Sequence, residues 1–247
     1  MTFHPARHSA KQSMILFVAL GLVFSGLAQA ATPHKRTRNQ NRVGPYGAAF
    51  VGQTNYRADQ SNNEQTLEDI LALNDIPFQN LSSKTEEKDI GYQATFGFRF
   101  HRFFSAEIGL VQYGEMVSSA NAELDFPDDD PIGYIPAKVS LGYRVGGVLF
   151  SGLAILPIRD KIELYGRVGY LFANSEREFI SRVEGQQTLS GSAKGDSQDL
   201  VLGLGVGWNI NVIYSIRAEY QRLSDVGSPN TGTEDFDFVS LGLIVRF

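Results

Sequence analysis

A chain of 247 residues can hold one large domain or two small ones, and 25 Gly with only 9 Pro favour a single β-rich unit. The chain contains no Cys, which excludes disulfide bonds, thiolate metal sites and a cysteine nucleophile. A hydrophobic fraction of 43% argues against a disordered chain, and at a formal net charge of −5 we expect no nucleic-acid partner.

The N-terminus has the order of a secretory signal peptide. Arg7 and Lys11 precede an uninterrupted apolar run over residues 14–23, and an Ala-Gln-Ala cleavage site ends at Ala30. The run is short for a membrane-spanning helix. We therefore predict a cleaved signal peptide over residues 1–30, with an uncleaved N-terminal anchor as the alternative.

The rest of the chain divides into a basic leader and one long domain. Residues 31–45 contain four basic residues and no acidic residue, and we interpret them as a flexible periplasmic leader. Residues 46–247 contain no stretch that approaches 18 uninterrupted apolar residues, which excludes a helical membrane protein. The remaining choices are a soluble exported protein and a β-barrel.

Eight segments after the leader alternate between apolar and polar residues with a period of two, which is the pattern of β-strands. The last segment is the clearest, because Val239, Leu241 and Leu243 fall on one face while Ser240 and Gly242 fall on the other. We predict eight strands with an apolar outer face and a polar inner face. Their approximate ranges are 46–55, 90–100, 104–110, 139–156, 162–172, 199–210, 214–221 and 239–247.

The fourth segment changes its alternation in the middle. Its apolar residues occupy odd positions before Gly146 and even positions after Gly147. One extra residue in a strand shifts which face the side chains meet, and glycine tolerates the backbone that this requires. We therefore predict a β-bulge at these two glycines.

The connections between the segments alternate in length. Residues 101–102, 157–161 and 209–213 form short turns, whereas residues 56–89, 115–138, 174–197 and 224–235 form long polar stretches that we predict to be loops. Short turns on one rim and long loops on the other are typical of an outer-membrane barrel. Since an unpaired strand edge is not tolerated in lipid, the strands must close into an eight-stranded antiparallel up-and-down transmembrane β-barrel, an all-β fold.

Aromatic residues occur near the ends of most segments. Where they face outward, they would form the girdles that mark the two membrane interfaces. The candidates are Tyr46, Tyr92, Tyr113, Tyr143, Tyr165, Tyr170, Trp208, Tyr214 and Tyr220.

Three segments of the chain resemble the transmembrane domain of the outer membrane protein A superfamily, which includes the opacity-type surface antigens. They are residues 104–110, 156–169 and 216–221, and the terminal residues 241–247 support the resemblance. The resemblance implies a Gram-negative outer-membrane location and an interior ion pair between Glu107 and Arg217. A second interior pair of the family would fall at Leu153 and Gly207, and both of its members are missing here, which puts in doubt any gating by exchange between two pairs. The terminal Phe247 resembles the signal read by the outer-membrane assembly machinery.

Six charged residues on the predicted inner faces are candidates for a lumen site. They could line an ion path, or they could form the paired polar core of a narrow barrel, which we favour because an eight-stranded interior is filled by side chains. The six are Glu107, Arg217, Glu219, Arg167, Glu163 and Arg99.

Three other features have both a functional and a structural interpretation. The densest acidic run could hold calcium or a divalent ion that bridges lipopolysaccharide, but a solvated loop tip is favoured. Its members are Asp125, Asp128, Asp129 and Asp130. Gly203, Gly205 and Gly207 resemble a phosphate loop only superficially, because more strand follows them. Residues 66–73 could form a short helix that contacts a partner or packs on the barrel.

The first hypothesis for function is a structural and surface-interaction protein, the second a narrow low-conductance pore, and the third a lipid-modifying enzyme. An enzyme is not expected, because after the signal peptide only His34 and His101 remain, and neither lies near a plausible lipid or peptide groove. We expect no cofactor. The expected partners are outer-membrane lipids and lipopolysaccharide, the outer-membrane assembly machinery, and a surface ligand that the sequence does not identify.

Overall fold

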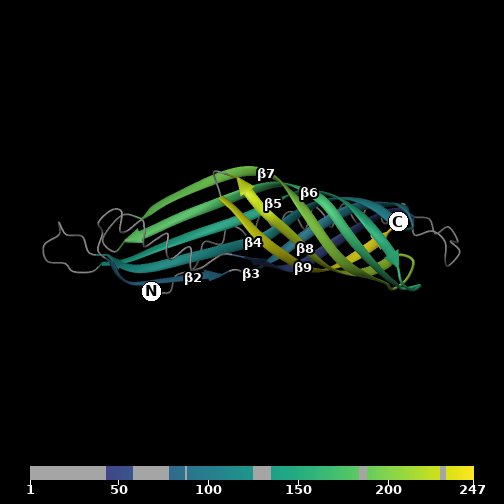
Figure 1. Cartoon of the computed structure of the whole chain (residues 1–247), viewed down its shortest axis with the longest axis horizontal. Coiled ribbons are helices and arrows are strands. Elements are labelled where there is room, and N and C mark those ends of the chain that lie inside the picture. The colour runs from purple at the N-terminus through teal and green to yellow at the C-terminus, as the bar shows by residue number, and fades with distance from the viewer. Residues whose placement is uncertain (1–42, 58–77, 87, 125–134, 184–187, 229–231) are drawn as a thin grey trace.

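The computed structural model describes residues 43–57, 78–86, 88–124, 135–183, 188–228 and 232–247, and the predicted signal peptide and most of the leader lie outside these ranges. The described residues form one elongated antiparallel β-structure (Figure 1). Its strands are β1 (Gly44–Tyr56), β2 (Phe78–Glu86), β3 (Lys88–His101), β4 (Phe104–Leu124), β5 (Ile135–Pro157), β6 (Ile162–Val183), β7 (Leu189–Asn209), β8 (Tyr214–Ser228) and β9 (Gly232–Arg246). Within these ranges the model contains no helix that is long and apolar enough to cross a membrane.

Eight of these strands close into a ring. Each strand from β3 to β9 pairs with the next one along the chain, and β1 closes the ring by pairing with both β3 and β9. Strand β2 pairs with β4 beyond the end of β3. The prediction of an eight-stranded antiparallel barrel is confirmed, and β2 is an additional strand in a region that the sequence pattern predicted to be a loop.

An apolar belt surrounds the ring, because successive side chains of each strand point alternately to lipid and to the lumen. On β7, for example, Leu202 and Leu204 are exposed whereas Val201 is fully buried. On the side away from the short turns, the outward-facing row of every ring strand changes from apolar to polar. We call these positions the belt edge, and they are Gln53, Lys88, Gln112, Arg144, Asn174, Gln198, Arg222 and Asp237.

Four ring strands continue far beyond the belt edge, so the long polar loops predicted over residues 115–138 and 174–197 are mostly strand. Strands β4 and β5 remain paired to Leu124 and Ile135, and β6 and β7 remain paired to Ser181 and Leu189. In Figure 1 these strands run on past the ends of β8 and β9. We call this part, together with β2, the extracellular extension. The prediction failed because strands that meet water on both faces do not need an apolar face.

The predicted β-bulge lies on a different strand. Tyr113 and Gly114 of β4 lie opposite the single residue Val145 of β5, and Gly114 has a φ of 86°. Strand β5 passes through Gly146 and Gly147 in unbroken register with β6. The apolar residues at odd positions do not face lipid, since Val145 is fully buried in the lumen. The change that the sequence shows on β5 therefore reflects an outward-facing row that turns from polar at Arg144 to apolar at Phe150, while the inward-facing row stays largely apolar.

The aromatic residues predicted for the interface girdles divide into two groups. Tyr92, Tyr170, Trp208, Tyr214 and Tyr220 face outward and are exposed, as a girdle position requires. The other four are buried in the lumen, because they share the inward alternation of their strands. These four are Tyr46, Tyr113, Tyr143 and Tyr165.

Candidate functional site in the lumen

A network of buried charges crosses the lumen at the level of the apolar belt. Arg217 of β8 contacts Glu107 of β4, with 2.6 Å between Nη1 and Oε1. Arg167 of β6 lies between two carboxylates, because its Nη2 is 2.8 Å from Oε2 of Glu107 and its Nε also contacts Glu219 of β8. All four side chains are buried. Each charge therefore has an opposite charge in contact, which offsets the cost of removing it from water.

Two tyrosines complete this network. Tyr46 donates a hydrogen bond of 2.5 Å to Oε1 of Glu107, and Tyr165 donates one of 2.7 Å to Oε2 of Glu219. The guanidinium of Arg217 lies between their rings, 5.2 Å from the ring centre of Tyr46 and 5.0 Å from that of Tyr165. The rings thus hold the Arg217 side chain between them as well as supplying donors to the carboxylates. We refer to these six residues as the central network.

The other two candidates form a separate ion pair near the rim of the short turns. Nη1 of Arg99 lies 3.1 Å from Oε1 and 3.2 Å from Oε2 of Glu163, and both side chains are buried. Arg99 also donates hydrogen bonds to the backbone carbonyls of His101 and Arg102 in the adjacent turn. The six charged candidates therefore lie in the lumen as two clusters at different depths.

An apolar layer fills the lumen on the other side of the central network. The Tyr113 ring lies 4.8 Å from the ring of Phe236 and 5.3 Å from that of Phe238, and Tyr56 lies 5.1 Å from Phe236 and 6.3 Å from Tyr143. All five side chains are buried, and leucines and valines of the surrounding strands pack with them. We call this cluster the aromatic layer. Rings packed at these distances make this level of the lumen predominantly apolar.

A short chain of hydrogen bonds joins the two regions. Nε2 of Gln221 donates to Oε1 of Gln93 over 2.9 Å, and the hydroxyl of Tyr113 donates to Oε1 of Gln221 over 3.2 Å. Gln93 in turn donates to Thr95. Because these buried amides have partners, the lumen changes from charged to apolar without leaving their polar atoms unpaired.

The positions of the missing second family pair also lie in the lumen. Leu153 is buried and packs with Ile155 and Tyr165. A Cβ built at Gly207 would lie 3.8 Å from Cγ of Arg217, so the aliphatic part of that arginine occupies the adjacent space. In place of a second charged pair, the lumen therefore has apolar packing at Leu153, and the aliphatic part of Arg217 lies close to Gly207.

Sequence reasoning missed three parts of the site. The sequence pattern predicts Tyr46 and Tyr165 only as girdle residues, although Tyr165 shares the inward alternation of Glu163 and Arg167, which is the available signal. It does not single out Ser151, which accepts a hydrogen bond of 2.5 Å from Arg167. It does not predict the aromatic layer, because it assigns apolar residues to the lipid-facing side.

The remaining candidate sites have less structural support. The acidic residues Asp125, Asp128, Asp129 and Asp130 lie outside the described residues. In the part of the chain that the structure describes, no group of three or more His, Asp or Glu side chains could hold a metal ion. The backbone N–H of Phe247 donates to the carbonyl of Pro45 over 3.2 Å, which ties the end of the chain to the start of β1.

Comparison with known proteins places this barrel in a family. The model of the OmpA-like transmembrane domain matches residues 46–247. The chain belongs to this family. The match covers all eight strands of the ring almost completely and makes the chain an integral protein of the Gram-negative outer membrane.

Individual relatives of this OmpA-like chain are distant. Outer membrane protein A of Escherichia fergusonii is 26% identical over 180 residues, which are 70% of this chain and 44% of that protein. The chain thus spans less than half the length of this curated relative. Among solved structures, Neisserial surface protein A is similar with a TM-score of 0.44 and 11% identity over 84% of this chain and 100% of that one. The outer membrane protease OmpT of Escherichia coli is similar with a TM-score of 0.40 and 9% identity over 85% and 100%.

Proposed function

We propose that this protein is a closed structural barrel that anchors the extracellular extension in the outer membrane, and that the extension is a surface for contact with molecules outside the cell. The observation that carries this proposal is that four strands continue beyond the belt edge by about ten residues each, roughly 30 Å at the rise of a strand. Such length is not needed to cross the membrane.

The filled lumen supports the structural part of the proposal. The central network and the aromatic layer occupy successive levels of the barrel, and the buried ion pairs join strands that are far apart in the ring. A protein is destabilised when one partner of a buried ion pair is removed, because the other charge then stays buried without compensation. This arrangement favours a rigid scaffold over a narrow low-conductance pore, which would require the aromatic layer to move.

The inner face of the extension supports the interaction part. Leu141, Phe179 and Leu189 are 37%, 39% and 67% exposed, although they lie in the water-facing part of the molecule. Leu141 pairs with Phe179 across β5 and β6, and Leu189 lies on β7 opposite Ser181. Exposed apolar side chains that are grouped in this way are characteristic of contact surfaces. A surface of this kind needs no catalytic group, and we propose no enzymatic role.

Binding should therefore depend on the extension and not on the lumen. The test replaces Phe179 and Leu189 by Ser in the full chain and measures attachment of cells that express it to a cultured cell monolayer. The matched control is Ile180→Ser, on the opposite face of β6. We expect attachment to fall in the double variant and to stay unchanged in the control.

The lumen is tested in the same assay with Arg217→Gln. Correct insertion of every variant is checked by its resistance to unfolding in detergent before heating. If attachment is insensitive to the extension variants, or if it changes with the lumen variant while the barrel stays folded, the proposed interaction role is wrong.

A further inference from the structure

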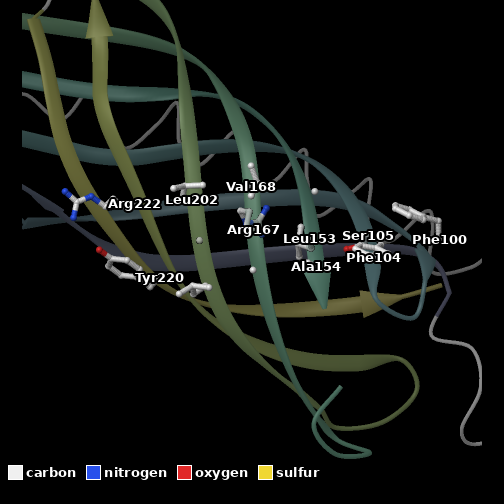
Figure 2. Close-up of a pocket in the computed structure, with 14 residues that line it drawn as sticks. Phe100, Phe104, Ser105, Leu153, Ala154, Arg167, Val168, Leu202, Tyr220 and Arg222 are labelled. Atoms are coloured by element: carbon white, nitrogen blue, oxygen red, sulfur yellow. The ribbon is translucent and has the colours of Figure 1, made fainter. Parts of the chain in front are cut away.

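The outer wall of the barrel carries a groove within the apolar belt. It has a volume of about 690 Å³ and is lined by residues of β3 to β8, from Phe100 and Phe104 at one end to Tyr220 and Arg222 at the other (Figure 2). Because Phe104, Tyr220 and their outward-facing neighbours point away from the lumen, this wall groove opens toward lipid.

The groove exists because small residues follow one line across neighbouring strands. Ala154 of β5 pairs with Gly166 of β6, and Gly152 lies on the same outer face two residues before Ala154. A Cβ at Gly152 would meet nothing within 4 Å, and a Cβ at Gly166 would come no closer than 3.8 Å to Leu204. The depression is therefore open space and not a place where another side chain already packs.

The two ends of the groove lie at different depths in the membrane. Phe104 is the first residue after a short turn, whereas Arg222 is at the belt edge. The path crosses four gaps between strands β4 and β8, which is roughly 19 Å at the usual strand separation. That length runs around the wall, across the strands, and in depth the groove extends from the rim of the short turns to the extracellular belt edge. Its half next to Arg222 therefore lies in the outer leaflet.

A cation stands at the outer end of this apolar path. The Arg222 side chain is 44% exposed, its Nη2 lies 3.9 Å from Oδ2 of Asp235, and Arg222 pairs with Asp237 across β8 and β9. Tyr220, at the same end, donates its hydroxyl to Asp237. An apolar channel that ends at an arginine matches a molecule with a long hydrocarbon chain and an anionic head group.

We propose that the wall groove binds one acyl chain of lipid A, with a phosphate of its head group at Arg222. The occupant is a lipid of the outer leaflet because the groove opens into hydrocarbon and its charged end is at the extracellular belt edge. A second barrel would present a convex wall, which cannot enter a narrow depression over its length. The proposal depends on the membrane location and is independent of the interaction role of the extension.

Selection of this lipid must come from packing and from the phosphate contact. Hydrocarbon already surrounds the barrel, so burial of a chain in the groove gains no hydrophobic free energy. Dispersion contacts in a depression of matching width and a charge-assisted hydrogen bond at Arg222 distinguish the bound lipid from its neighbours. Filling the depression or removing the cation should each release it.

The experiment uses the folded full chain in detergent with added lipid A, and native mass spectrometry counts the lipid retained per barrel. The first variant, Gly152→Leu with Gly166→Leu, fills the groove, and its matched control Ala49→Leu adds the same side chain to the lipid-facing side of β1. The second variant is Arg222→Gln, with Lys194→Gln as the control on an exposed cation above the belt. Parallel samples contain phosphatidylglycerol in place of lipid A.

We expect each test variant to reduce the retention of lipid A by roughly five-fold, and each control to leave it unchanged. Equal retention by the groove-filled variant and the unaltered chain would overturn the proposal. Equal retention of phosphatidylglycerol with the same response to the variants would overturn the assignment to lipid A. Loss of a dimer in the groove-filled variant, without loss of lipid, would assign the groove to a second copy of the chain instead.

Discussion

Arg217 and Glu107 join opposite walls of the barrel. Arg217 is on β8 and Glu107 on β4, which are four strands apart in the ring of eight, and their side chains meet with 2.6 Å between Nη1 and Oε1. Since Glu107 also contacts Arg167, one carboxylate balances two buried cations from different strands. The barrel is thus cross-linked through its interior as well as closed around its circumference.

Replacement of Glu107 should destabilise the barrel strongly. Glu107→Gln leaves Arg217 without its carboxylate partner and Arg167 with Glu219 alone, and breaking a buried pair in this way costs about 3–5 kcal/mol. The loss is measured as the change in free energy of unfolding in urea for the chain folded in lipid vesicles.

The control for this loss is Glu176→Gln on the same barrel. Glu176 pairs with Lys194 over 3.1 Å, but the Lys194 side chain is 65% exposed. An exposed pair contributes about 0–1 kcal/mol, so this variant should unfold almost like the unaltered chain. Equal losses of unfolding free energy in the two variants would mean that the central network contributes no more to stability than an exposed ion pair does.

The position of the Tyr165 ring explains why position 205 is glycine. A Cβ at Gly205 would overlap the Tyr165 ring, which donates its hydroxyl to Glu219. Gly205→Ala should displace the ring and destabilise the barrel by about 1–3 kcal/mol. Gly152→Ala is the control, because its Cβ would enter open space. Heat-dependent unfolding in detergent compares the two, and a larger loss in the control would show that backbone effects and not the ring are responsible.

Reversal of the Arg99 and Glu163 charges tests the second ion pair. Arg99→Glu or Glu163→Arg alone places two like charges together in a buried space, and the double exchange restores an opposite pair. The double variant should recover at least about 1 kcal/mol relative to the sum of the two single losses. Recovery is expected to be partial, because Arg99 also donates to the backbone of the adjacent turn. Simple additivity of the single losses would show that the two side chains do not interact.

The extracellular extension should be ordered β-structure in solution. Its strands pair continuously from the belt edge to Leu124 and Ile135 on β4 and β5. Paired amides of residues 115–124 and 135–144 should exchange their hydrogens on the order of 100-fold more slowly than an unstructured peptide, because exchange requires local opening. Mass-spectrometric hydrogen exchange of the chain in nanodiscs measures this. Exchange at the rate of a free peptide would mean that these segments are loops.

The sequence allowed most of the ring to be predicted, because lipid imposes an alternation on every strand that crosses it. The ends of the strands could not be located from the sequence. Beyond the belt edge both faces of a strand meet water, so neither face has to be apolar, and segments such as residues 174–183 have the composition of loops. The same limit explains the misplaced bulge. Val145 is apolar and faces the lumen, and only its pairing with the Tyr113 and Gly114 segment reveals that β4 carries the extra residue.

The candidate site was predictable to the extent that charge identifies an inward position. Alternation places Glu107, Arg167, Arg217 and Glu219 on inner faces, but their partners depend on the shear and curvature of the closed barrel, which no local pattern encodes. The aromatic residues were ambiguous for a different reason. A tyrosine is suited both to a membrane interface and to a polar lumen, so Tyr46 could be assigned only when its strand was placed in the ring.

Planar-bilayer recording of the refolded full chain tests the central claim that the lumen is closed by the central network and the aromatic layer. The unaltered barrel should insert without a sustained current above that of the bare membrane, and Phe236→Ala with Phe238→Ala should introduce a current by removing two rings from the aromatic layer. A steady current through the unaltered chain, of the same size as in the double variant, would contradict a closed lumen and favour the pore.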